Sequence, residues 1–187
     1  MNRTNNRITC NFNNTITERD MDLLLAEMLS TDSDFCHLVV EKTDLKGKSF
    51  KVIKVEVSKS DNDLGESDIT VIVEVDGEKY GLLIEDKIDA IAMPDQHERY
   101  TKRGDKGIKA KDYKDYRVFI FCPEKYRENN SEAKLYEHLL TYEECRDYFK
   151  GKDDPLSSYR YQQLSQAITK AKKAPSVTVD KDANAFF

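Results

Sequence analysis

The sequence lacks a long apolar run, and this absence excludes a membrane-spanning segment. None of its apolar stretches approaches the ~20 residues that a transmembrane helix requires. The amino-terminal residues also lack the apolar region of a secretory signal, so we expect a cytoplasmic protein that makes no membrane contact. The length of 187 residues suits one domain with a hydrophobic core.

Paired cysteines and an excess of basic residues are absent as well. The four cysteines lie far apart and form no CxxC pair, which argues against a zinc site or a redox motif. The formal net charge is −5 at pH 7. Because nucleic-acid binders are often basic, this total counts mildly against one, although the distribution of charge along the chain matters more than its sum.

The clearest pattern that the sequence contains is a β-hairpin with strands over residues 67–75 and 80–87. Apolar residues alternate along the first strand, and an Asp-Gly dipeptide at 76–77 favours a two-residue type I′ turn. This turn fixes the pairing of the strands and predicts that Asp68 lies opposite Glu85. The apolar residues of the hairpin then share one face and can pack on a core.

The other face of this hairpin carries charged groups at one end. Directly opposed side chains have Cβ atoms roughly 4.5–5.5 Å apart, so Asp68 and Glu85 would repel unless a cation lay between them. Lys87 projects from the same face, two residues after Glu85. The sequence therefore suggests a divalent cation bound by carboxylate oxygens. The alternative is a solvated face on which Glu66 and Lys87 form an ordinary surface pair.

The amino-terminal part suggests a loose arm over residues 1–14, followed by a helix that begins near Thr15 or Thr17. Thr15 and Glu18 have the spacing of a capping box. Glu18 and Asp22 lie on the flank of the apolar stripe of this helix. Their charges either complement the helix dipole or point a carboxylate into a site.

The remaining elements follow from local patterns in the sequence. Apolar residues alternate in 50–58, with Ile53 among the inward-facing positions. A nearly continuous apolar run in 116–122 is typical of a strand that is buried on both faces and paired in parallel. We expect strands over 50–58, 116–122 and 136–141, helices that begin at Pro94, Thr141 and Asp154, and either a helix or a strand over 34–42.

A basic stretch follows the hairpin. Residues 99–117 hold eight Lys or Arg against three Asp, a local excess of five positive charges. We expect a loop around Gly104 to Gly107. The stretch is either a solvated loop or a patch that contacts phosphates, and its position directly after the candidate metal site favours the patch. The candidate contacts are Arg99, Lys102, Arg103 and Lys106.

These motifs together resemble the core of the PD-(D/E)XK nuclease superfamily. Asp68 in GESDI corresponds to the first acid, and residues 85–87 correspond to the (D/E)-X-K element. Residues 96–100 match the Q-x-x-x-Y element of one branch, and Glu18 looks like the carboxylate that some members supply from their first helix. Ser67 stands where many members have proline.

The resemblance implies an α/β fold with a restriction-endonuclease-like core, in which a mixed central sheet with an antiparallel hairpin is flanked by helices. The nuclease-like domain would cover residues 15–172. A tail over 173–187 would follow and would lead toward a missing region. A further carboxyl-terminal domain and a homodimer are both left open.

The resemblance also implies a metal-dependent nuclease that hydrolyses phosphodiester bonds, with DNA favoured over RNA as substrate. The chain is also similar to nuclease-like proteins of phage defence or mobile elements. Asp68, Glu85 and the Asp86 carbonyl would bind Mg²⁺ or Mn²⁺, and Lys87 would orient a water molecule or stabilise developing charge.

Gln96 and Tyr100 would position the substrate or the groups around the metal, and Glu18 would bind a second metal or its water. The alternative is a binding or interaction module that retains this fold without catalysis. A third interpretation is an unrelated α/β protein whose motifs match by accident.

Overall fold

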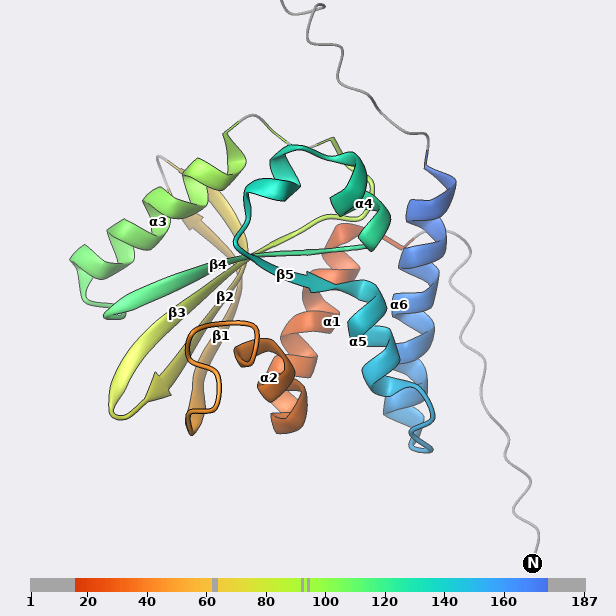
Figure 1. The fold of residues 1–187 in the computed structure, drawn as a ribbon, viewed down its shortest axis with the longest axis horizontal. Helices are drawn as coiled ribbons and strands as arrows, with labels where there is room; N and C mark the ends of the chain where they lie inside the picture. The colour runs from red at the N-terminus through yellow and green to blue at the C-terminus, as the bar shows by residue number, and fades with distance from the viewer. Residues whose placement is uncertain (1–15, 62–63, 92, 94, 175–187) are drawn as a thin grey trace, which may run out of the picture.

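A computed structural model of the chain describes residues 16–61, 64–91, 93 and 95–174. The expected arm at 1–14 and nearly all of the tail at 173–187 lie outside these residues. The elements in chain order are α1 (Glu18–Thr31), α2 (Ser33–Val40), β1 (Phe50–Asp61), β2 (Gly65–Val75), β3 (Glu78–Asp86), α3 (Gln96–Ala110), β4 (Asp115–Cys122), α4 (Glu124–Asn129), η1 (Glu132–Leu135), β5 (His138–Thr141), α5 (Tyr142–Phe149) and α6 (Pro155–Lys173) (Figure 1).

The five strands form one mixed sheet in the order β1-β2-β3-β4-β5. The first three strands pair antiparallel, whereas β3, β4 and β5 pair in parallel. This topology confirms the predicted α/β fold with a mixed central sheet. The amino end of β2 therefore lies at the same edge as the carboxyl ends of β3, β4 and β5, and open α/β sheets bind ligands at that edge.

The hairpin pairs in the predicted register. Val75 lies opposite Glu78, and the pairing continues to Ile69 opposite Ile84. Asp76 and Gly77 both have positive φ, 53° and 79°, as a type I′ turn requires. The local turn chemistry thus determines which side chains meet at the far end of the hairpin.

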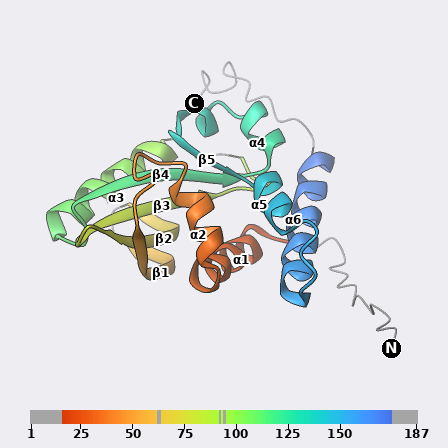
Figure 2. The ribbon, with the colours of Figure 1, turned by 60° about the horizontal axis from the view of Figure 1, so that its bottom comes forward.

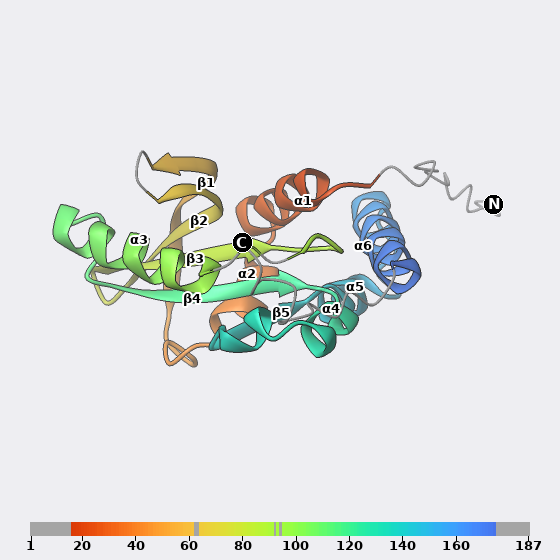
Figure 3. The same ribbon diagram turned by 90° about the horizontal axis from the view of Figure 1, so that it is seen from above.

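Helices cover both faces of the sheet and separate two apolar clusters. The larger cluster packs β2, β3 and β4 against α1, α2, α5 and α6, and the smaller cluster packs the opposite face against α3 and η1. Figure 2 shows α1 and α2 on one side of the sheet and α3 on the other. Figure 3 shows α6 beside α1 and α5, away from α3. None of the helices in the described residues is long and apolar enough to cross a membrane.

Strand β1 departs from the predicted alternation. A bulge lies between Val52 and Lys54, so that Ile53 is 41% exposed while Val52 and Val55 pack against the larger cluster. The prediction that Ile53 faces inward is therefore wrong. The extra residue of a bulge reverses the facing of every position before it, and the sequence alone gave no sign of it.

Helix α3 runs without interruption through Gly104 and Gly107, so the predicted loop there is wrong. A Cβ atom on Gly104 would overlap the ring of Tyr116, and one on Gly107 would overlap the ring of Tyr113. Both glycines are therefore needed for close contact between the helix and the tyrosines that follow it. The absence of a side chain at these two glycines allows the tyrosine rings to pack against the helix, although glycine has a low helix propensity.

Helix α1 begins with a capping box formed by Thr17 and Asp20. The sequence predicts this box at Thr15 and Glu18, and Thr15 lies outside the described residues. Pro94, the expected start of α3, also lies outside them. Residues 33–40 are helical, and the predicted helix starts at Thr141 and Asp154 are confirmed, the first by a capping box and the second by an N-cap.

Candidate active site

Asp68 and Glu85 come together at the edge where the hairpin ends. The backbone pairing of β2 with β3 ends at Ile69 and Ile84, one step before these two acids. An Oδ2 atom of Asp68 accepts a hydrogen bond of 2.8 Å from the backbone N–H of Asp86. The side chain of Asp68 thus continues the contact between the strands. Glu85 is only 2% exposed, and Lys87 forms an ion pair with it.

Lys87 lies among oxygen atoms. Its Nζ donates to the Asp86 carbonyl at 3.0 Å and lies 3.8 Å from Oε2 of Glu18, in addition to its ion pair with Glu85. Burial alone would lower the pKa of this amine, but the charges of Glu85 and Glu18 outweigh burial and hold the pKa above its ordinary value. Lys87 is therefore a positively charged ammonium in this site.

Helix α1 supplies two further carboxylates. Oε1 of Glu18 accepts a hydrogen bond of 2.9 Å from the backbone N–H of Ile88. Because Asp20 closes the capping box, Glu18 can reach the segment after β3. Asp22, one turn further along, is 6% exposed, and its Oδ1 has no hydrogen-bond partner in the described part of the chain. Burial and the charge of Asp68 raise the pKa of Asp22 to about 7.

The negative charge at this edge is poorly compensated. Burial, followed by the charge of Glu85, raises the pKa of Asp68 to about 7. The Asp86 carboxylate lies at a different position from these acids, since its Oδ1 accepts a hydrogen bond of 2.5 Å from Tyr142 in the larger apolar cluster. Complete burial, with a further contribution from Asp22, holds the pKa of Asp86 well above its ordinary value.

Gln96 and Tyr100, on the first two turns of α3, both contact this edge. The side-chain amide of Gln96 donates to Oε1 of Glu85. The hydroxyl of Tyr100 accepts from the backbone N–H of Asp68 at 3.0 Å and donates to the carbonyl of Ile84 at 3.2 Å. Tyr100 thus bridges the two strands where their pairing ends. Burial raises the pKa of its hydroxyl, which stays protonated and able to donate.

The basic residues that we predicted as nucleic-acid contacts all lie on α3: Arg99, Lys102, Arg103 and Lys106. Their spacing of three or four residues places them along one side of the helix. Lys102 pairs with Glu98, and the Arg103 guanidinium lies 4.7 Å from the centre of the Tyr100 ring. Arg117, at the end of the same basic stretch, instead forms ion pairs with Asp44 and Asp115. The basic stretch is therefore not one continuous patch.

Two tyrosines near the site were missed by the sequence analysis. The hydroxyls of Tyr126 and Tyr136 are buried and lack hydrogen-bond partners within the described residues. Burial raises the pKa of both, and the charge of Glu85 acts on each of them. Tyr136 also packs its ring against His97 of α3. Tyr126 belongs to α4 and Tyr136 follows η1, and neither segment shows a periodicity that would reveal its position.

The donor atoms at this edge suit a hard divalent cation, because all of them are carboxylate or carbonyl oxygens. The raised pKa of Asp68 and the unpaired oxygen of Asp22 both indicate negative charge that the protein itself does not balance. In the described residues, no three or more His, Cys, Asp or Glu side chains are already gathered as metal ligands. The carboxylate of Glu85 already pairs with Lys87, and the carboxylate of Asp68 already accepts a hydrogen bond from the backbone N–H of Asp86. A bound cation would compete with both contacts.

A mixed sheet with two acids and a lysine at the edge of its central strands is an arrangement that suits phosphodiester chemistry with a divalent metal. The sequence pattern of the PD-(D/E)XK nuclease superfamily matches residues 9–187. The chain therefore belongs to this superfamily. Comparisons with curated proteins and with solved structures gave no significant match. Assignment to the Q-x-x-x-Y branch stays a prediction.

Proposed function

We propose that this protein is a nuclease that hydrolyses phosphodiester bonds of nucleic acid with Mg²⁺ or Mn²⁺, and that DNA is its preferred substrate. The observation that carries the proposal is the meeting of Asp68, Glu85 and Lys87 at one edge of the sheet. Membership of a nuclease superfamily supports the same reaction class.

Asp68, Glu85 and the Asp86 carbonyl are the groups that would hold the cation. A bound divalent cation lowers the pKa of its water and neutralises charge on a phosphate. Glu18 and Asp22 add two carboxylates on the α1 side, which suit a second cation or a water molecule bound to it. Both are within the electrostatic reach of Lys87.

Lys87 would donate to a non-bridging phosphate oxygen. Its ammonium is a compact charge with three donors, and it stays protonated because carboxylates surround it. Gln96 and Tyr100 are positioning residues, because they hold Glu85 and the backbone of Asp68. The proposed site therefore combines oxygen ligands for a metal, the positive charge of the Lys87 ammonium and two positioning side chains from α3.

The proposal is tested by cleavage assays with labelled single-stranded DNA, duplex DNA and RNA, each with Mg²⁺, Mn²⁺ or EDTA. We expect Asp68→Asn and Lys87→Met to lower the rate by at least about 100-fold, in line with the loss of one group that stabilises the transition state. Glu74→Gln and Lys79→Met are matched controls at the far end of the hairpin and should retain wild-type rates.

Cleavage that survives both site substitutions would assign the activity to another site or to a contaminant. Calorimetric titration with Mn²⁺ separates the nuclease from a non-catalytic module on the same fold. The nuclease should bind Mn²⁺, and Asp68→Asn should weaken that binding. A wild-type protein that binds nucleic acid but neither binds Mn²⁺ nor cleaves would support the non-catalytic module.

A further inference from the structure

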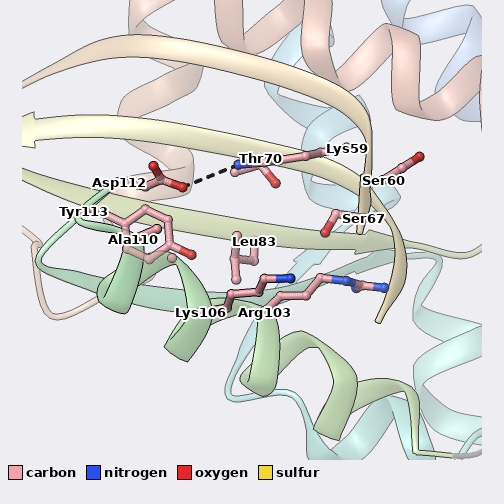
Figure 4. A pocket seen from close by; sticks show the side chains of 11 residues that line it. Lys59, Ser60, Ser67, Thr70, Leu83, Arg103, Lys106, Ala110, Asp112 and Tyr113 are labelled. Atoms are coloured by element: carbon pink, nitrogen blue, oxygen red, sulfur yellow. Dashed lines mark ion pairs between the residues drawn. The ribbon is translucent and has the colours of Figure 1, made fainter. Parts of the chain in front are cut away.

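A pocket of about 150 Å³ lies beside the candidate active site, between the outer part of the sheet and α3 (Figure 4). Strands β1 and β2 form one wall and α3 forms the other. The pocket is small enough to hold a single compact group. The residues that matter for its chemistry are Lys59, Ser67, Thr70, Arg103, Lys106 and Asp112.

The lining of this pocket carries more positive than negative charge. Lys59, Arg103 and Lys106 line it together with one acid, Asp112, which lies 3.7 Å from Lys59. Figure 4 shows Arg103 and Lys106 extending from α3 in the same direction, toward the part of β2 that carries Ser67. The pocket therefore favours an anion.

Several hydrogen-bond donors in the pocket have no acceptor. Thr70 is 2% exposed, and its Oγ1 has no partner among residues 16–174 as far as these are described. Nε and Nη1 of Arg103 are likewise buried without partners there, whereas Nη2 donates to the carbonyl of Leu64. A buried donor without an acceptor is costly, and a ligand with several acceptor oxygens would remove that cost.

An irregularity of β1 helps to form the pocket. Ser58 has φ 57°, a left-handed conformation that is uncommon for a residue with a side chain. The pairing with β2 keeps the same register on both sides of Ser58, and Lys59 and Ser60 line the pocket directly after it. The side-chain oxygen of Ser58 accepts a hydrogen bond from Arg19 of α1, which helps to hold this conformation.

The pocket and the active site share two elements. Thr70 is two residues after Asp68 on β2, roughly 7 Å along the same face of the strand. On α3, the Arg103 guanidinium lies over the Tyr100 ring, and the Tyr100 hydroxyl bonds to the Asp68 backbone. A group in the pocket would therefore lie close to a group at the carboxylates.

We propose that this pocket binds one phosphate of the nucleic-acid backbone, one or two nucleotides from the phosphate that is cleaved. The separation of roughly 7 Å is about one backbone repeat of a nucleic-acid strand, because adjacent phosphates lie further apart through space than their axial rise of about 3.4 Å. The ligand is a phosphate because its oxygens can accept from a hydroxyl, a guanidinium and an ammonium together. This inference rests on the proposed nuclease function and adds a contact that fixes the substrate in register.

The first test measures binding of a fluorescent single-stranded oligonucleotide by anisotropy, in EDTA so that no cleavage occurs. We expect Thr70→Val to weaken binding about 5- to 10-fold, because it removes the hydroxyl donor and keeps the branched shape. Its melting temperature should equal or exceed that of the wild type, since the lost hydroxyl has no partner in the free protein. A fall in affinity without a fall in stability separates ligand contact from misfolding.

Salt dependence gives a second readout. Lys106→Gln should reduce the slope of log K against log salt by about 0.7, the value for one phosphate contact with a single strand. Lys114→Gln is the matched control, because Lys114 is exposed and lies near Glu78 at the far end of the hairpin. The control should leave both the affinity and the slope unchanged.

The position of the bound phosphate can be found with oligonucleotides that carry one neutral methylphosphonate linkage. The wild type should lose affinity at one linkage near the cleavage point, and Thr70→Val should be insensitive at that linkage. Inorganic phosphate alone should raise the melting temperature of the wild type more than that of Thr70→Val. Phosphate protection that an oligonucleotide does not displace would mean that the ligand is free phosphate, against the proposal.

The outcomes distinguish this inference from the proposed function. A wild-type protein that binds no oligonucleotide would overturn the nuclease proposal and this inference with it. Wild-type binding and cleavage that Thr70→Val and Lys106→Gln leave unchanged would overturn the phosphate pocket alone.

Discussion

Among the described residues, buried charged groups gather in two places, and these differ in how the charge is balanced. In one cluster, Arg160 of α6 is 4% exposed and donates to Glu27, Asp32 and Thr31. The hydroxyl of Tyr148 adds a further hydrogen bond of 2.9 Å to Asp32. Every charged group of this cluster has a partner, and the cluster ties α6 to α1.

The other cluster is the candidate active site, where one amine faces an excess of acids. Lys87 pairs with Glu85 and lies near Glu18, and the charges of Asp68 and Asp22 also act on it. Burying carboxylates without matching positive charge destabilises the folded protein. The contrast indicates that the Arg160 cluster contributes to stability, whereas the carboxylate cluster lowers the stability of the folded protein as long as no ligand balances its charge.

The largest expected effect comes from breaking the balanced cluster. Arg160→Met leaves Glu27 and Asp32 without their partner and should lower the free energy of unfolding by about 3 kcal/mol, or roughly 10 °C in melting temperature. Thermal unfolding by circular dichroism measures this change. Arg146→Met is the control, because Arg146 forms an exposed pair with Asp147 and such pairs contribute little. Equal melting temperatures for the two variants would contradict the comparison.

A substitution in the unbalanced cluster should have the opposite sign. Asp68→Asn removes a charge that burial and Glu85 disfavour, and Asn can still accept from the Asp86 amide. We expect a gain of about 1–2 kcal/mol at pH 7.5 in EDTA, after allowing for solvent screening. Chemical denaturation gives the value. Destabilisation by this variant would show that the charge of Asp68 is compensated in the folded protein.

The gain from Asp68→Asn should depend on pH. The pKa of Asp68 is about 7 in the folded protein and near 3.8 in the unfolded chain, so the folded protein binds the extra proton. The contribution of Asp68 to the free energy of unfolding of the wild type is therefore fully present below about pH 4, and it is lost as pH rises toward 7. The difference between variant and wild type should vanish near pH 4. The difference is the quantity to measure, because the lowered pKa of Glu27 acts in the opposite direction.

The smallest effect is expected for Asp22, which lies at the border of the site. Asp22→Asn should raise the melting temperature in EDTA by about 1–3 °C, since it removes a buried charge whose pKa is about 7. In calorimetry it should weaken Mn²⁺ binding less than Asp68→Asn does. A larger loss of Mn²⁺ binding than that of Asp68→Asn would place the cation mainly on the α1 side.

The sequence could predict the acids of the hairpin because their positions depend on local rules. The dipeptide Asp76-Gly77 determines the turn, the alternation of apolar residues determines the faces, and together they set Asp68 opposite Glu85. No contact with a distant segment is needed for this step, and the confirmed register of the hairpin followed from it.

Other features depend on contacts between distant segments and could not be read in this way. Asp22 lies on a helix flank, and only the docking of α1 on the sheet decides that this flank is buried. Gly104 and Gly107 follow the local pattern of a loop, but the rings of Tyr113 and Tyr116 occupy the space beside them. Local propensity therefore failed where a neighbouring element determines the fit.

The Tyr100 hydroxyl joins two strands and one helix through a single oxygen atom. Because Arg103 lies over the same ring, a substrate that binds and shifts Arg103 would also shift Tyr100, whose hydroxyl bonds to the Asp68 backbone. Binding of the polymer at Arg103 would thereby influence the position of Asp68, the proposed metal ligand. Cleavage would then proceed fastest on chains long enough to span both points.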